Sequence, residues 1–112
     1  MRRIAVLLLG VGMVWATLVS AAWAAEAEIA LTIEKNQFQP AEIKVKAGAP
    51  FVLVITNKDA TAEEFESKEL RIEKVIPAGK TVRVRVPALK AGTYRFVGEY
   101  HEKTAKGRIV SE

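Results

Sequence analysis

Apolar and polar residues alternate in a series of short segments that runs through most of the chain after residue 28. The clearest segment is 82–86, in which three valines alternate with Arg83 and Arg85. Successive side chains of a strand point to opposite faces, so this period of two predicts half-buried β-strands. Glycine and proline separate the segments and end them. About seven strands are expected, at 29–33, 43–45, 51–55, 70–75, 82–86, 94–97 and 107–111.

Short strands at this spacing, without a sustained helical period, indicate an all-β fold. We expect an antiparallel β-sandwich, a Greek key, with a small β-barrel as the alternative. The segment 51–55 is apolar at every position, which is typical of a strand covered on both faces. The alternating apolar positions expected to face the core are Leu31, Ile33, Ile43, Val45, Val52, Val54, Val82, Val84, Tyr94, Phe96 and Ile109.

The first part of the chain has a different composition. Two arginines follow the first methionine, an almost entirely apolar run covers 4–19, and small residues follow it. This order is typical of a secretory signal peptide, and the run is shorter than the roughly 20 residues that span a membrane. We therefore expect a signal peptide over 1–24, with cleavage after Ala22 as the alternative. The remaining domain, 25–112, would be a soluble periplasmic protein.

The composition excludes several classes of function. The chain has no cysteine, so disulfides, thiolate metal sites and cysteine nucleophiles are excluded. It has 17 lysines and arginines against 13 acidic residues, but the basic residues are spread singly, which argues against nucleic acid as a partner. There is no glycine-rich phosphate loop and no arrangement of a catalytic triad. The sequence therefore supports neither nucleotide nor hydrolytic chemistry, and it leaves open whether the protein is an enzyme.

Two polar segments, 57–67 and 98–107, are interpreted as loops that carry the chemistry. The first contains three glutamates, and the second contains two glutamates and the only histidine of the chain. In extended segments, residues two apart lie on the same side, which would group the glutamates of the first loop and the Glu99–His101 pair. Carboxylate oxygens with one imidazole suit iron or divalent copper. The pairs grouped in this way are Glu64 with Glu66 and Glu99 with His101.

The second half of the chain resembles the cupredoxin family. The resemblance lies in Asn57 at a strand end, the Tyr94–Phe96 motif, His101 at the downstream histidine, Gly107 and the last strand. It implies a cupredoxin fold. Copper-binding members carry a cysteine, a second histidine and a methionine in addition. Those positions are occupied here by Gly98 or Glu99, by Glu63 or Glu64, and by Ala105. A blue-copper site needs a thiolate, so the resemblance does not extend to that site.

The segments 64–67, 73–74, 98–101 and 104–107 are similar to those of a narrower group, the cysteine-less cupredoxin-like proteins of bacterial iron-uptake systems. These proteins work beside high-affinity iron permeases. The resemblance implies a carboxylate-rich iron or copper site whose candidate metal ligands, carried over by position, are Glu64, Glu66, Glu99 and His101. It also implies a role in iron uptake, by ferrous oxidation or by handing iron over to a permease. The alternative is an interaction module that binds no metal and docks on a membrane transporter.

Overall fold

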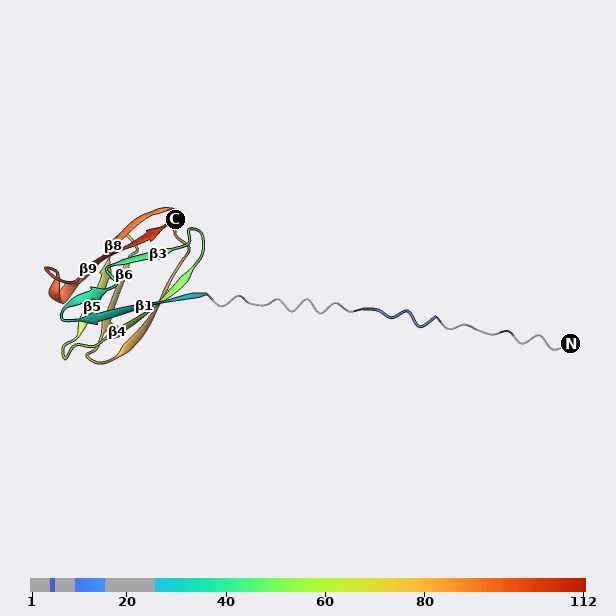
Figure 1. The fold of residues 1–112 in the computed structure, drawn as a ribbon, viewed down its shortest axis with the longest axis horizontal. Coiled ribbons are helices and arrows are strands. Elements are labelled where there is room, and N and C mark those ends of the chain that lie inside the picture. The colour runs from blue at the N-terminus through green and yellow to red at the C-terminus, as the bar shows by residue number, and fades with distance from the viewer. Residues whose placement is uncertain (1–4, 6–9, 16–25) are drawn as a thin grey trace.

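The computed structural model describes residues 5, 10–15 and 26–112, and residues 27–111 form two β-sheets. Figure 1 shows the strands and the short helix that follows β8. The predicted signal peptide, 1–24, lies mostly outside the described residues. The elements are β1 (Ala27–Glu34), β2 (Gln37–Gln39), β3 (Glu42–Val45), β4 (Phe51–Asn57), β5 (Glu63–Ser67), β6 (Ile72–Ile76), β7 (Thr81–Val86), β8 (Gly92–Gly98), the 3₁₀ helix η1 (Glu99–His101) and β9 (Lys106–Ser111).

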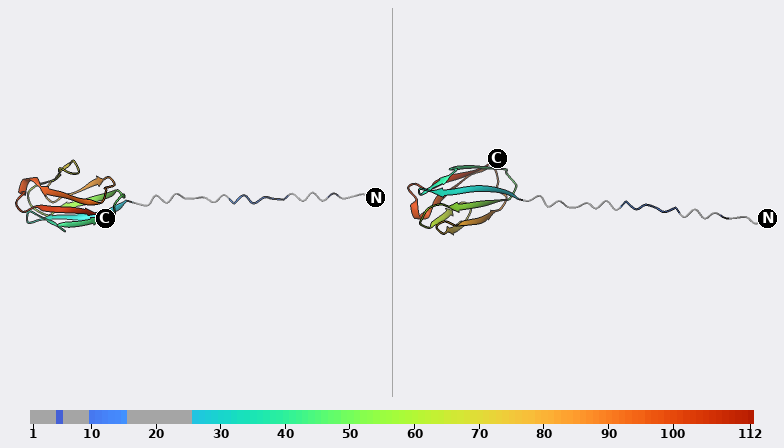
Figure 2. Two further views of the ribbon diagram at one scale, coloured as in Figure 1. Left: turned by 90° about the horizontal axis from the view of Figure 1, so that it is seen from above. Right: turned by 60° about the horizontal axis from the view of Figure 1, so that its bottom comes forward.

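The two sheets pack face to face, as Figure 2 shows from two further sides. One sheet has the strand order β2-β1-β4-β7, and the other has the order β3-β9-β8-β5-β6. The predicted all-β sandwich is confirmed. It has nine strands in the described residues rather than about seven. The pairs β1–β4 and β3–β9 are parallel, whereas the remaining pairs are antiparallel.

The short strand β2 and the strand β5 were not expected from the sequence. Residues 63–67 were interpreted as part of a loop because the inward positions of β5 are not all apolar. Glu63, Phe65 and Ser67 are buried, and Glu64 and Glu66 are half-buried on the other face. Hydrogen bonds offset the free-energy cost of burying the two polar residues, Glu63 and Ser67. Ser67 Oγ, for example, donates to the carbonyl oxygen of Arg95 at 2.7 Å. The strand alternates in burial although it does not alternate in polarity.

The core lies between the sheets, and three of its four phenylalanines, Phe38, Phe65 and Phe96, lie close together. The ring centroids of Phe38 and Phe65 both lie 5.0 Å from that of Phe96. These separations are typical of favourable aromatic pairs. The cluster joins β2 to β5 and β8 and so fixes the sheet that carries the polar segments.

Most of the predicted core positions are confirmed, but Val52 and Val54 were wrong. On β4 the buried residues are Phe51, Leu53 and Ile55, which leaves the two valines on the outer face. Because both faces of this strand are apolar, alternation alone does not select the inward set. The valines are half-buried among the neighbouring strands. In register, Val52 lies beside Arg85, and Val54 lies beside Arg83; arginine stems commonly cover such apolar surface.

Candidate metal centre

The strands β5, β6 and the end of β8 bring four glutamates to the outer face of the five-stranded sheet. Strand β5 pairs with β6 on one side and with β8 on the other. The pleat directs Glu64 and Glu66 outward, because the alternate residues of β5 are buried. Glu66 lies directly opposite Glu73 of β6, and Glu99 continues from the end of β8. Like charges placed opposite each other in a sheet are destabilising, so this face is electrostatically crowded.

Three of these carboxylates come close enough together to share a cation. One carboxylate oxygen from each of Glu64, Glu73 and Glu99 lies within 4.8 Å of the others. Hydrogen bonding with Glu64, and repulsion from Glu64, Glu66 and Glu73, raise the pKa of Glu99 to about 7. Repulsion of this kind disfavours the charged form of a carboxyl group. A bound cation would relieve it.

Beneath this face lies a second polar pair, Glu63 with His101. Glu63 is only 1% exposed, and its Oε2 lies 2.5 Å from Nδ1 of His101. Its Oε1 accepts hydrogen bonds from the backbone N–H groups of Glu64 and Tyr100, both at 3.0 Å. The buried carboxylate therefore has three partners, which offset the cost of removing it from water.

The structure brings Glu64 and Glu99 together, and it places Glu66 on the same face. His101 is turned toward Glu63 instead. The extended conformation expected for 99–101 was wrong, because these residues form the 3₁₀ helix η1. With three residues per turn, positions two apart no longer lie on one side. His101 keeps 28% of its side chain exposed, and its Nε2 is the ring nitrogen that Glu63 does not engage.

The sequence does not predict the roles of two residues of this region, Glu73 and Glu63. Glu73 joins the carboxylates only through the pairing of β5 with β6, so it becomes visible once 63–67 is recognised as a strand. Glu63 was noted as one of two residues at the family's upstream histidine position. The contact with His101, 38 residues later in the chain, distinguishes it from Glu64.

The interior positions of the cupredoxin site do not fit a blue-copper ion. A Cβ atom placed on Gly98 would lie 2.6 Å from Cβ of Ala105 and 2.6 Å from Cδ of Glu63. Real Cβ atoms do not approach other atoms so closely, so even the first atom of a cysteine side chain requires rearrangement. The chain also has no cysteine. The Glu63–His101 pair and Ala105 fill the space beside Gly98, and a thiolate site is excluded.

Comparison with known proteins agrees with this architecture. Residues 5–111 match the cupredoxin-like domain family. The chain belongs to this family. Over 83 residues it is 35% identical to the protein RP394 of Rickettsia prowazekii, a match that covers 74% of this chain and 66% of that protein. The chain thus spans just under two thirds of this relative's length.

Two solved structures show the same fold at low sequence identity. One is auracyanin A, a "blue" copper protein of Chloroflexus aurantiacus, with a TM-score of 0.67 and 16% identity over 78% of this chain and 99% of that one. The other is the metal-binding domain of the Cu(I)-exporting P-type ATPase CopA of Streptococcus pneumoniae, solved with Cu(I). It has a TM-score of 0.68 and 21% identity over 76% of this chain and 84% of that one. Within the described residues, no helix is long and apolar enough to cross a membrane.

Proposed function

We propose that this cupredoxin-like protein binds a metal ion, iron or copper, on the outer face of the five-stranded sheet and serves iron uptake in the periplasm. The observation that carries the proposal is the convergence of Glu64, Glu73 and Glu99, whose carboxylate oxygens lie within 4.8 Å of one another. The raised pKa of Glu99 agrees with a site that lacks a neutralising charge. The copper-binding structures of the same fold lend the proposal further support.

The donor atoms favour a hard cation. The proposed ligands are Glu64, Glu66, Glu99 and His101, with Glu73 as an addition from the pairing of β6. Anionic oxygens stabilise a high charge, so this set binds Fe(III) more tightly than Fe(II) but accepts both ions. It suits Cu(II) less well than a nitrogen-rich site does. Iron is the cargo in this proposal, and the protein's own contribution is to hold it in a set of oxygens at the surface.

Glu63 would orient His101 toward the metal. Histidines that bind metals commonly donate their other ring N–H to a carboxylate, which fixes the tautomer and the ring orientation. The 2.5 Å contact between Nδ1 of His101 and Oε2 of Glu63 is such an arrangement. It reserves Nε2 for the metal. In this proposal the buried Glu63 positions the histidine and does not itself bind the ion.

The cellular setting of the proposal comes from the N-terminus and from the resemblance to iron-uptake proteins. Cleavage of residues 1–24 would release the domain into the periplasm. There it would hand iron over to a membrane permease. The competing function is an interaction module that binds no metal.

Calorimetric titration of the purified protein with Fe(II) under anaerobic conditions, and separately with Cu(II), tests the proposal. We expect one metal per chain, with weaker binding for Glu64→Gln, Glu66→Gln and His101→Ala. Glu66→Gln should weaken binding more for iron than for copper. Glu34→Gln, on the opposite sheet, is the matched control and should bind like the wild type. If the wild type binds neither metal, or if the three variants bind as it does, the interaction-module function replaces this proposal.

A further inference from the structure

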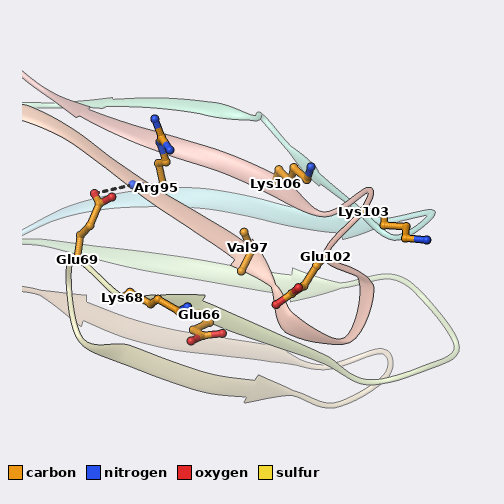
Figure 3. Close-up of a pocket in the computed structure, with 8 residues that line it drawn as sticks. All are labelled: Glu66, Lys68, Glu69, Arg95, Val97, Glu102, Lys103 and Lys106. Carbon is orange, nitrogen blue, oxygen red and sulfur yellow. Dashed lines mark hydrogen bonds between the residues drawn. The ribbon is translucent and has the colours of Figure 1, made fainter.

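A groove of about 490 Å³ crosses the outer face of the same sheet and is lined by charges of both signs (Figure 3). Its volume lies in the range of small-molecule sites. Four cationic side chains line it, from the β5–β6 turn, from β8, from the segment before β9 and from the first residue of β9: Lys68, Arg95, Lys103 and Lys106. None of the four takes part in the ion pairs found among residues 26–112. The groove therefore offers positive charge that the protein does not neutralise by direct pairing.

The position of Arg95 points to an anion. Arg95 lies directly opposite Arg108 in the pairing of β8 with β9. Arg108 is paired with Glu42, whose carboxylate lies 2.8 Å from its guanidinium, whereas Arg95 has no such partner in the described part of the chain. Like charges opposite each other destabilise a sheet. An anion bound at Arg95 would offset that repulsion.

Carboxylates line the same groove: Glu66, Glu69 and Glu102. Oε2 of Glu69 accepts the backbone N–H of Arg95 at 3.0 Å, the dashed contact in Figure 3. In Figure 3, Arg95 and Lys106 lie on one side of Val97, and Glu66, Glu102 and Lys68 lie on the other side. The first side would repel a bare cation. The second side carries two carboxylates against one lysine, so it favours the cationic part of a ligand. A ligand with both kinds of charge satisfies both sides.

We propose that the groove binds a metal–polycarboxylate chelate, with the chelator's free carboxylates at Arg95 and Lys106 and the metal end toward Glu66. Glu66 lines the groove and also lies directly opposite Glu73, one of the three carboxylates of the metal centre, in the pairing of β5 with β6. The groove thus adjoins the metal centre. This inference rests on the proposed function, because it names the chemical form in which the metal ion reaches the protein.

Equilibrium dialysis with three probes tests this inference: ferric citrate, citrate alone, and Fe(II) alone under anaerobic conditions. The wild type should bind ferric citrate more tightly than citrate. Neutralising the cations in Arg95→Gln/Lys106→Gln should weaken ferric citrate binding at least about tenfold and leave Fe(II) binding unchanged. Lys80→Gln, which removes a cation outside the groove, is the matched control and should match the wild type.

The inference is overturned if the double variant binds ferric citrate as the wild type does, if the wild type binds no ferric citrate, or if citrate alone binds equally well. Fe(II) binding separates this inference from the proposed function. If Fe(II) binds but the chelate does not, the proposed chelate site in the groove is wrong and the proposed metal centre is still supported. If the chelate binds through Arg95 and Lys106 but Fe(II) does not bind, the proposed chelate site is supported and the proposed metal centre is wrong.

Discussion

Replacing Glu63 tests whether the buried Glu63–His101 pair holds the site region together. Glu63→Leu removes the acceptor for three donors, the N–H groups of Glu64 and Tyr100 and Nδ1 of His101. Each hydrogen bond to a charged group contributes about 1.5–3 kcal/mol. The donors are only partly buried, so water replaces some of the lost bonds. We expect a loss of about 3–5 kcal/mol, the cost commonly found when one partner of a buried pair is removed.

Glu63→Gln is the matched variant, because it keeps the volume of the side chain and one carbonyl oxygen. That oxygen can still accept from the N–H groups of Glu64 and Tyr100, so we expect a smaller loss of about 1–2 kcal/mol. Urea unfolding followed by circular dichroism, in buffer with a metal chelator, gives both values from the transition midpoints at constant slope. A Glu63→Leu variant within about 0.5 kcal/mol of the wild type would refute the reasoning.

Three further predictions concern charge, register and copper. The pKa of Glu99 is raised from 4.5 to about 7 in the folded protein, so the folded state binds this proton more tightly than the unfolded state does. This preference stabilises the fold fully below pH 4.5, and the stabilisation is lost as the pH rises through about 7. Glu99→Gln should therefore stabilise the metal-free protein more at about pH 8 than at about pH 5 in thermal unfolding, and an equal effect at both would contradict the crowding. Leu53→Ala should cost about 2–5 kcal/mol and Val54→Ala roughly 1 kcal/mol in denaturant unfolding, and a larger cost for Val54→Ala would mean that β4 faces the other way. Added Cu(II) should produce only weak ligand-field absorption, and an intense thiolate charge-transfer band would contradict the excluded blue-copper site.

The sequence predicts the strands whose inward residues are apolar and whose outward residues are polar. Strand β7 meets both conditions, with Val84 and Val86 buried and Arg83 and Arg85 exposed. Strand β5 meets only the second, because Glu63 is buried through hydrogen bonds supplied by a distant segment. Hydrophobic alternation does not detect a polar residue whose partners come from elsewhere in the fold.

The candidate site shows the same limit. The glutamates of the two polar segments could be named from the sequence, but their neighbours depend on strand pairing. Glu73 joins Glu64 and Glu99 because β6 pairs with β5. His101 turns toward Glu63 because Glu99–His101 form a 3₁₀ helix, whose period differs from that of an extended loop. Local spacing therefore predicts the residue types of a site better than it predicts which side chains meet.

The most direct test of the metal centre is the metal content of the protein after purification under anaerobic conditions without a chelator. We expect iron or copper bound to the wild type at close to one ion per chain, and much less in Glu64→Gln/Glu99→Gln. Mass spectrometry of the metals, with Glu34→Gln prepared in parallel as the control, provides the measurement. Wild-type protein free of both metals, or a double variant that retains them in full, would contradict a metal centre at these carboxylates.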